Sequence, residues 1–244
     1  MEIRGNGQLA LVTGATSGIG MAVAAKLLQD SWTVICCGRR LGELDALPRG
    51  QGLIIRQPLD LMDSESISGC VRFVAQQKQR LDLVVHCAGS GLVGKATDKQ
   101  VTDYRQMNVY GSQKLILALV PHMKRDSRVC ITTSMMGLLP WVPGCRQYIY
   151  AKRDLRVWAE NHRVEWAELG ISLTQIVPGF VKTNFYQHAI GFPGLLVWTG
   201  GPFWQIPAEV CANEIVQAIK SGQEACYPGA DAKLVHWLCR DSTS

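Results

Sequence analysis

The sequence predicts an α/β protein in which a doubly wound parallel sheet lies between two layers of helices, a three-layer αβα sandwich. Short apolar runs alternate along the chain with longer stretches of helical periodicity. These runs lack the polar alternation of half-exposed strands, so helices must cover both faces of the sheet. With 244 residues, 47% hydrophobic and 18% charged, the chain suits one domain spanning residues 1–244.

Six apolar runs are the expected strands, and helices are expected between them. The first helix follows a glycine-rich turn, because Met21, Ala24, Ala25 and Leu28 recur at three- and four-residue spacing. A similar pattern over residues 107–119 indicates another helix, and residues 234–240 suit a short amphipathic one. The expected strands are Leu9–Val12, Trp32–Cys37, Leu53–Ile55, Leu81–Val85, Arg128–Thr132 and Ile171–Val177, and the clearest expected helices are Met21–Gln29 and Arg146–Leu169.

From Ala189 to Ala208 this alternation stops, and twenty residues pass without a charged side chain. Length alone would allow a membrane span, but four glycines and three prolines would leave backbone groups unsatisfied in lipid. A long apolar insertion between regular elements is more typical of a lid over a binding site, here at about residues 184–208. The alternatives are a packed surface segment, a subunit interface or a membrane contact.

Charge and cysteine content exclude several classes of protein. The 25 Lys+Arg and 20 Asp+Glu leave a net charge of +5, but basic residues are never grouped beyond doublets, which argues against a nucleic-acid partner. The nine cysteines include no C-x-x-C motif, and several lie inside apolar runs, so we expect buried thiols and no metal site. The start of the chain shows no apolar signal region, which predicts a reducing, cytoplasmic location.

Residues Thr13–Gly20 read T-G-A-T-S-G-I-G between an expected strand and an expected helix. Glycines there permit a tight bend and close approach of the backbone to a pyrophosphate, which the helix N-terminus would bind. About 20 residues further on, an acid would bind the ribose of NAD(H), but the second strand ends at Arg39 and Arg40. Two guanidiniums suit a 2′-phosphate, which favours NADP(H) over NAD(H). After the third strand, Asp60 and Leu61 would lie near the adenine, or Asp60 would simply cap the next helix.

Tyr148 and Lys152 stand four residues apart in an expected helix, so their side chains share one face. An ammonium beside a phenol lowers the pKa of the phenol, which is the condition for acid–base catalysis at a carbonyl or an alcohol. Taken alone, such a pair is an ordinary amphipathic pattern. Ser134, however, follows the strand that ends at Thr132, at the edge of the sheet where the glycine-rich turn also lies.

Together these residues resemble the short-chain dehydrogenase/reductase family, in its single-domain branch with a Rossmann fold. The resemblance covers nearly the entire chain, and the combination of motifs is specific. The motifs are TGxxxGxG at Thr13–Gly20, Cys87-Ala88-Gly89 where the family has Asn-Ala-Gly, Asn108, Ser134 with Gly137 three residues later, YxxxK at Tyr148–Lys152, and Pro178-Gly179 followed by Thr183.

The resemblance implies catalytic roles for four residues. Tyr148 would act as general acid toward the carbonyl oxygen, and Lys152 would bind the nicotinamide ribose and lower the pKa of Tyr148. Ser134 would orient the substrate oxygen, and Asn108 would hold a water for proton relay. The resemblance also implies a homodimer or homotetramer.

Two sets of binding residues complete these expectations. Those for the substrate are Ser134, Tyr148, Phe185, Phe192 and Trp198. Those for NADP(H) are Gly14, Thr16, Ser17, Gly18, Ile19, Gly20, Arg39, Arg40, Asp60, Leu61, Cys87, Ala88, Gly89, Tyr148, Lys152, Pro178, Gly179, Val181 and Thr183.

The chain departs from the family pattern at two places. Cys87 replaces an asparagine that supports the turn beside the cofactor, so we expect a local adjustment there without loss of function. Between Ser134 and Tyr148 the spacing is one residue longer than is commonest in the family, and a loop absorbs such an insertion.

We therefore expect an NADP(H)-dependent oxidoreductase that reduces a carbonyl, or oxidises the corresponding alcohol, on a hydrophobic substrate. The expectation that the substrate is hydrophobic rests on the apolar segment from Ala189 to Ala208. Two alternatives stay open: a non-catalytic NADP(H)-binding sensor or scaffold, and a membrane-peripheral protein that uses this segment as an anchor.

Overall fold

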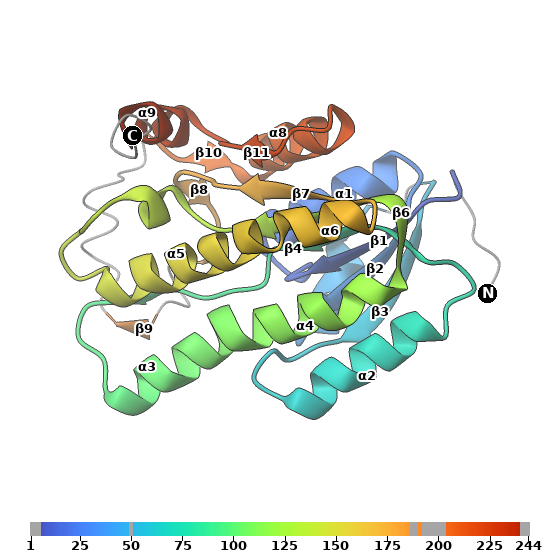
Figure 1. Ribbon diagram of the computed structural model, residues 1–244, viewed down its shortest axis with the longest axis horizontal. Helices are drawn as coiled ribbons and strands as arrows, with labels where there is room; N and C mark the ends of the chain where they lie inside the picture. The colour runs from blue at the N-terminus through green and yellow to red at the C-terminus, as the bar shows by residue number, and fades with distance from the viewer. Residues whose placement is uncertain (1–5, 49–50, 186–189, 192–203, 240–244) are drawn as a thin grey trace.

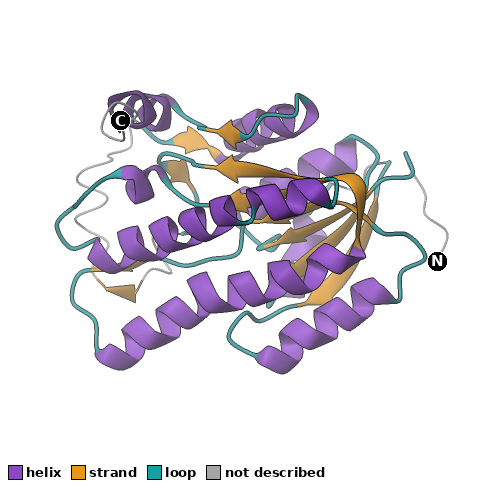
Figure 2. Cartoon of the chain, in the orientation of Figure 1, coloured by secondary structure: helices purple, strands orange, loops and turns teal. Residues whose placement is uncertain are grey.

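The computed structural model describes residues 6–48, 51–185, 190–191 and 204–239. Within these residues, seven parallel strands form one sheet in the order β11-β7-β6-β4-β1-β2-β3 (Figures 1 and 2). Strand order reverses between β1 and β4, so the expected doubly wound sheet is confirmed. The strands are β1 (Leu9–Thr13), β2 (Thr33–Gly38), β3 (Leu53–Pro58), β4 (Leu81–His86), β6 (Met123–Thr132), β7 (Ile171–Ile176) and β11 (Ala225–Cys226).

Helices lie on both faces of the sheet, as Figure 2 shows. They are α1 (Gly18–Gln29), α2 (Ser64–Ala75), α3 (Asp98–Arg105), α4 (Ser112–Leu119), α5 (Arg146–Asn161), α6 (Arg163–Glu168), α8 (Ala208–Lys220) and α9 (Ala230–Cys239). The shorter turns are the 3₁₀ helices η1 (Leu41–Ala46), η3 (Val120–His122) and η4 (Met135–Leu138) and the π-helix η2 (Gln106–Gly111). Two short parallel pairs join β5 (Leu92–Val93) to β9 (Ile190–Gly191) and β8 (Val181–Lys182) to β10 (Ile206–Pro207).

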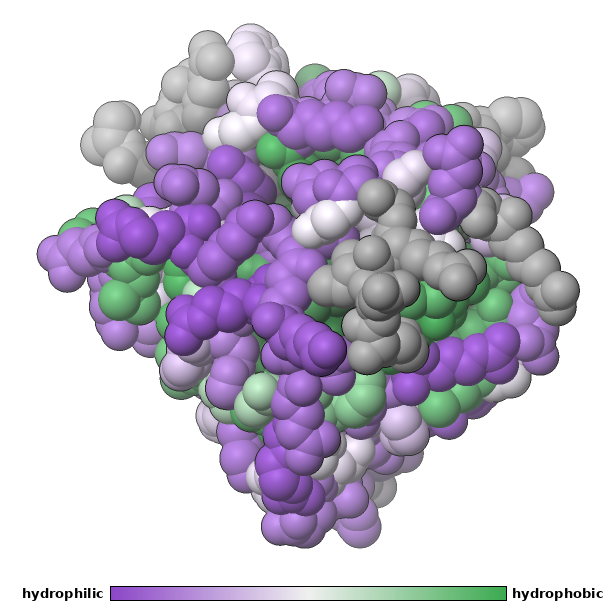
Figure 3. Space-filling model, turned by 90° about the vertical axis from the view of Figure 1, so that its right-hand side faces the viewer, coloured by the Kyte–Doolittle hydropathy of each residue, from purple (hydrophilic) through white to green (hydrophobic). Residues whose placement is uncertain are grey.

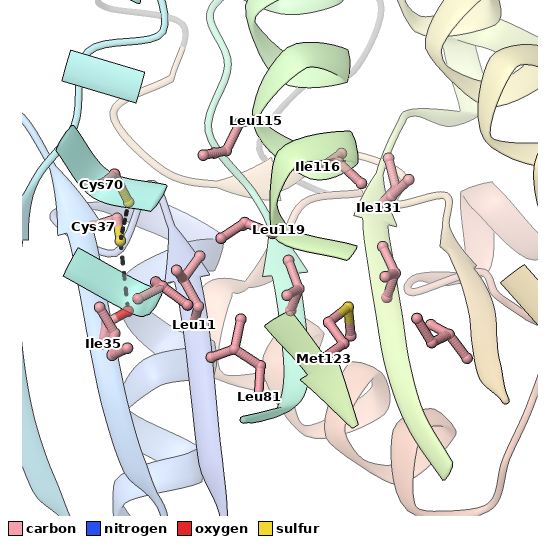
Figure 4. Packing of buried hydrophobic residues seen from close by; sticks show 14 of the residues in the cluster. Leu11, Ile35, Cys37, Cys70, Leu81, Leu115, Ile116, Leu119, Met123 and Ile131 are labelled. Carbon is pink, nitrogen blue, oxygen red and sulfur yellow. Dashed lines mark hydrogen bonds between the residues drawn. The ribbon is translucent and has the colours of Figure 1, made fainter. Parts of the chain in front are cut away.

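The two-residue period of the strands divides the core into two layers. Leu9 and Leu11 of β1 point into the layer beneath α2, α4 and α5, whereas Ala10 and Val12 point into the layer beneath α1 and α8. Figure 4 shows part of the first layer, where Leu115 and Leu119 of α4 lie over the strands. Because β1 and β2 are covered on both faces, they read as the nearly unbroken apolar runs from which they were predicted. The face drawn in Figure 3 is mostly hydrophilic, with apolar groups between.

Two elements in particular differ from the expected ones. β6 begins at Met123 and not at Arg128, because Met123 pairs with Leu81 at the start of β4. The charged residues that follow lie at a register shift, and the pairing with β4 resumes at Arg128. The helix expected over residues 146–169 is divided at His162 into α5 and α6. There the imidazole Nδ1 lies 2.8 Å from the carbonyl oxygen of Trp158, four residues earlier, and so competes with the helical hydrogen-bond pattern.

The π-helix η2 joins α3 to α4 and holds Asn108. It passes so close to the segment after β3 that a Cβ on Gly111 would lie 2.1 Å from the carbonyl oxygen of Leu61. Replacing Gly111 with alanine is therefore expected to lower the free energy of unfolding by about 1–3 kcal/mol, measured by urea denaturation. Gly42→Ala is the matched control, because a Cβ there meets nothing within 4 Å. Equal effects of the two substitutions would contradict this prediction.

Candidate active site

A cleft of about 280 Å³ opens at the carboxyl ends of the strands, beside the point where strand order reverses. Every residue that the sequence analysis assigns to the cofactor lines this cleft, and so do three of the four expected catalytic residues. The substrate candidate Phe185 lies on its wall, whereas Phe192 and Trp198 lie outside the described residues.

The glycine-rich turn brings backbone atoms to the surface of the cleft. Gly14 has a left-handed backbone (φ +67°), and a Cβ there would lie 2.9 Å from the amide nitrogen of Ala88. A Cβ on Gly20 would lie 2.4 Å from the carbonyl oxygen of Gly14, so α1 packs directly on the turn. Gly18 and Ile19, at the start of α1, line the cleft, and the first turn of α1 carries no acidic residue. This backbone cradle at the positive end of a helix fits the pyrophosphate of a dinucleotide.

The end of the cleft beside β2 carries the two arginines. Arg39 and Arg40 follow β2 directly and are exposed at the rim of the cleft. Asp60 also lines the cleft, and its Oδ1 accepts a hydrogen bond from the amide of Met62 (2.9 Å). The alternative in which Asp60 caps the next helix is wrong, because Asp63 is the N-cap of α2. The end with Arg39 and Arg40 therefore offers positive charge where the adenine ribose of a dinucleotide would lie.

Behind the cleft, a buried chain of hydrogen bonds joins β1, β4 and α4. The hydroxyl oxygen of Thr13 accepts the amide protons of Cys87 (3.1 Å) and Ala88 (3.0 Å), so its own proton is directed to Nδ1 of His86, 3.0 Å away. Nε2 of His86 then donates to Oγ of Ser112 (2.9 Å), which donates to a backbone carbonyl of η2 (3.1 Å). The turn at Cys87 is therefore held through its backbone, which explains how a cysteine fits where the family has asparagine.

This chain predicts a pH-dependent stability. Burial, with a smaller contribution from the charge of Lys152, lowers the pKa of His86 to about 3. Below pH 6.5 the unfolded chain protonates His86 and the folded chain does not, so the free energy of unfolding falls as the pH falls. Between pH 7 and pH 5 this group alone is expected to cost about 2 kcal/mol. Urea denaturation of the wild type and of His86→Asn at both pH values measures its share, and an unchanged pH dependence in the variant would contradict the assignment.

Three side chains meet at the reactive end of the cleft. Ser134 begins η4 directly after β6, and its Oγ accepts a hydrogen bond from the amide of Met136 (3.2 Å). Tyr148 and Lys152 lie one turn apart on α5. The Nζ of Lys152, a buried side chain, donates to the carbonyl oxygen of Thr132 (3.3 Å). All three line the same cleft, so the edge of the sheet brings them together as expected.

Burial is the largest cause of the pKa shifts of Tyr148 and Lys152. It raises the pKa of Tyr148 to about 12, although a hydrogen bond with Ser134 lowers it in part. It also lowers the pKa of Lys152 to about 8. In the chain alone, desolvation thus raises the pKa of Tyr148, and the lowering effect comes from Ser134 and not from Lys152 as expected. At neutral pH Tyr148 carries its proton, and it is a donor and not a base.

Asn108 lies behind the cleft and does not line it. Its Oδ1 accepts a hydrogen bond from the amide of Ser90 (2.9 Å), and its Nδ2 donates to the carbonyl oxygen of Tyr104 (2.9 Å). A Cβ on Gly89 would lie 2.9 Å from Asn108 Oδ1 and 3.5 Å from Lys152 Nζ, so the two side chains approach one another across this glycine. The structure thus places Asn108 next to Lys152, with its amide already bonded within the chain.

The wall near Tyr148 consists of the predicted Phe185 and of apolar residues that the sequence analysis did not name. Phe185 packs edge-on against the ring of Tyr148, with ring centroids 6.0 Å apart. The other apolar members of this wall are Val93, Met135, Met136 and Phe180. Met135 and Met136 follow Ser134 directly, a signal that could have identified them, whereas Val93 is brought in by tertiary contacts, since it packs with Cys145 and Ile149 and pairs with Gly191.

In the described ranges, no group of three or more His, Cys, Asp or Glu side chains is placed to hold a metal ion. Within the same part of the chain, none of the helices combines the length and the apolar composition that a membrane crossing needs.

Comparison with known proteins agrees with this geometry. The family model for short chain dehydrogenase matches residues 8–190. The chain is 29% identical over 258 residues to Dehydrogenase/reductase SDR family protein 7-like from Anopheles gambiae, covering 96% of this chain and 78% of that protein. It is 33% identical over 200 residues to 17-beta-hydroxysteroid dehydrogenase type 1 from Mus musculus, covering 75% of this chain and 57% of that protein.

The fold is also similar to that of solved structures. A short-chain dehydrogenase from Streptomyces avermitilis is 27% identical and has a TM-score of 0.83, covering 96% of this chain and 93% of that chain. Sequence match, strand order and the cleft at the carboxyl edge of the sheet agree with one another. The chain therefore belongs to the short-chain dehydrogenase/reductase family of oxidoreductases.

Proposed function

We propose that this protein is an NADP(H)-dependent oxidoreductase that reduces a carbonyl group, or oxidises the corresponding alcohol, on an apolar substrate. The observation that supports this most is a single cleft with Ser134, Tyr148 and Lys152 at one end and Arg39 and Arg40 at the other. The glycine-rich turn between these ends fits a pyrophosphate. When bound there, the cofactor supplies the hydride.

The reactive side chains supply and direct a proton. Tyr148 is protonated at neutral pH and donates to the oxygen of the substrate carbonyl. The Oγ of Ser134 already accepts an N–H bond, so its own proton is available for the same oxygen, where it stabilises developing negative charge. One N–H of Lys152 is bonded to Thr132, which fixes the ammonium and leaves two donors for the nicotinamide ribose and the phenol.

A neutral, apolar substrate is supported by the wall beside Tyr148. Val93, Met136 and Phe180 bring no charge to this part of the cleft, and Phe185 presents an aromatic edge. Methionine and aromatic side chains suit flat or irregular hydrophobic ligands. The similar mouse protein is named for a hydroxysteroid, a substrate of the same chemical character.

The proposal also includes the assembly of several copies of the chain into a homo-oligomer in the cytoplasm. Tyr110 and Leu117 on η2 and α4, and Tyr150 and Val157 on α5, are exposed apolar side chains at seven-residue spacing. These two pairs of exposed side chains, on helices that pack against one another, suit a helical interface between copies of the chain. Sedimentation equilibrium of the purified protein measures the assembly.

The proposed function is tested by binding first and turnover second. Fluorescence titration with NADPH and NADH is expected to give tighter binding of NADPH. Initial rates are then measured with NADPH and ketones of increasing apolar size, beside keto acids as controls. We expect kcat/KM to rise with apolar size and to be lowest for the acids, because the described apolar wall beside Tyr148 offers a carboxylate no charged partner. No binding of either cofactor would overturn the proposal.

A further inference from the structure

Two Pro-Gly pairs lie side by side at the edge of the sheet. Pro178-Gly179 follows β7, and Pro228-Gly229 follows β11, the neighbouring strand. The amide of Gly179 donates to the carbonyl oxygen of Pro228 (3.0 Å), which extends the pairing beyond the strands. The chain after the second pair turns into α9, the helix near the C-terminus in Figure 1.

The carboxylate of Asp231, in the first turn of α9, occupies the space that these glycines leave. Its Oδ2 accepts a hydrogen bond from the amide of Phe180 (2.7 Å), and its Oδ1 accepts one from the amide of Ala232 (2.9 Å). A Cβ on Gly179 would lie 2.0 Å from Oδ1, and a Cβ on Gly229 would lie 2.5 Å from it. Only glycine at both positions therefore leaves room for the carboxylate.

The segment held in this way leads directly to the reactive end of the cleft. The carbonyl oxygen of Pro178 accepts a hydrogen bond from the amide of Met135 (3.0 Å), the residue after Ser134. Further along, Val181 and Thr183 line the cleft, and Thr183 packs on the start of α1, where a Cβ on Gly18 would lie 3.2 Å from its Cγ2. Movement at residue 180 would therefore displace both the wall of the cleft and the support of Ser134.

We propose that Asp231 is a positioning residue for the nicotinamide end of the cofactor site. Its carboxylate fixes residues 178–183, and these set the affinity for the nicotinamide half of NADP(H). The inference rests on the proposed function. The competing explanation is that Asp231, as an acid in the first turn of a helix, stabilises α9 and nothing else.

Comparing whole and half cofactors separates the two explanations. Affinities for NADPH and for adenosine 2′,5′-bisphosphate, which has only the adenine half, are measured by titration in the wild type and in Asp231→Ala. We expect Asp231→Ala to raise the Kd for NADPH about tenfold, as for loss of a charge-assisted hydrogen bond, and to leave the Kd for the bisphosphate unchanged. Asp231→Asn keeps one acceptor for the Phe180 amide and is expected to recover much of the loss.

Glu214→Ala is the matched control, because it removes an ion pair between α8 and Lys233 of α9 (2.7 Å) without touching residues 178–183. It is expected to leave both affinities unchanged. Equal weakening of both ligands by Asp231→Ala, no weakening of either, or the same loss in Glu214→Ala would overturn the inference. Failure of the wild type to bind NADPH would instead overturn the proposed function, so the two failures are distinguishable.

A double-mutant cycle tests the contact itself. Gly179→Ala forces a Cβ against the Asp231 carboxylate and is expected to weaken NADPH binding. In the Asp231→Ala background the obstacle is absent, so Gly179→Ala should cost much less. Additive losses in the double variant would show that Gly179 and Asp231 act independently and would contradict the inference.

Discussion

Replacing Tyr148 with phenylalanine is expected to lower kcat by about 10²- to 10⁴-fold, the usual contribution of a positioned general acid. Phenylalanine keeps the ring that packs edge-on against Phe185, so the wall of the cleft is preserved. It removes the only atom of this side chain that can protonate the substrate oxygen. The Kd for NADPH should change little, and the loss should therefore lie in kcat and not in cofactor binding.

The chain supplies a control for this substitution on the same helix. Tyr150 is exposed two residues further along α5, with the guanidinium of Arg146 over its ring at 5.5 Å. Tyr150→Phe makes the same chemical change outside the cleft and is expected to leave kcat unchanged. Initial rates with a ketone that the wild type reduces well measure both variants. Turnover by Tyr148→Phe at the wild-type rate would exclude Tyr148 as the proton donor.

The pKa values of Tyr148 and Lys152 predict how catalysis depends on pH. Since burial raises the pKa of Tyr148 to about 12, this donor stays protonated throughout the neutral range, which suits carbonyl reduction. Lys152, with a pKa lowered to about 8 by burial, is the one of these two groups that titrates nearer to neutral pH. Loss of its charge above pH 8 is expected to weaken binding of the anionic cofactor, and this change should appear in KM for NADPH.

The fold was predictable from the sequence because its signals are local. β1 and β2 are covered on both faces, so their residues are apolar without interruption, and the TGxxxGxG turn marks the first strand-to-helix junction. The early start of β6 was not predictable, because Lys124, Arg125 and Asp126 read as a loop, and only the pairing of Met123 with Leu81 of β4 places the start of the strand before them. The π-helix at Asn108 likewise depends on contact of Gly111 with a carbonyl from a distant segment.

In the candidate site, too, some residues were predictable from local sequence motifs and others were not. Residues within sequence motifs were predicted to lie in the cleft, Gly14 and Ser134 because they follow strands and Tyr148 because the YxxxK motif pairs it with Lys152 on one face of a helix. Val93 reaches it through packing on Cys145 and Ile149 and through the pairing of β5 with β9, and Asp231 of α9 contacts the segment that follows Pro178-Gly179. Neither contact has a local pattern, so only the three-dimensional structure identifies these residues.

Replacing Arg39 and Arg40 together with alanine is expected to raise the Kd for NADPH by about 30- to 150-fold and to leave the Kd for NADH nearly unchanged. The two cofactors differ only in the 2′-phosphate, so NADH is an internal control for the fold and the pyrophosphate site. The expected effect is at the low end for two charge-assisted hydrogen bonds because both arginines are exposed and solvent screens them. Fluorescence titration with each cofactor measures the change.

Ionic strength distinguishes a specific phosphate site from general attraction to a basic protein. If Arg39 and Arg40 contact the 2′-phosphate, the wild-type preference for NADPH should decline with salt, and the double variant should show almost no salt dependence of that preference. Arg72→Ala removes a charge on α2 outside the cleft, where it pairs with Glu65 at 3.8 Å, and should alter neither affinity. Equal weakening of NADPH and NADH in the double variant would contradict a 2′-phosphate site. A preference that survives the loss of both arginines would place cofactor selection elsewhere on the rim.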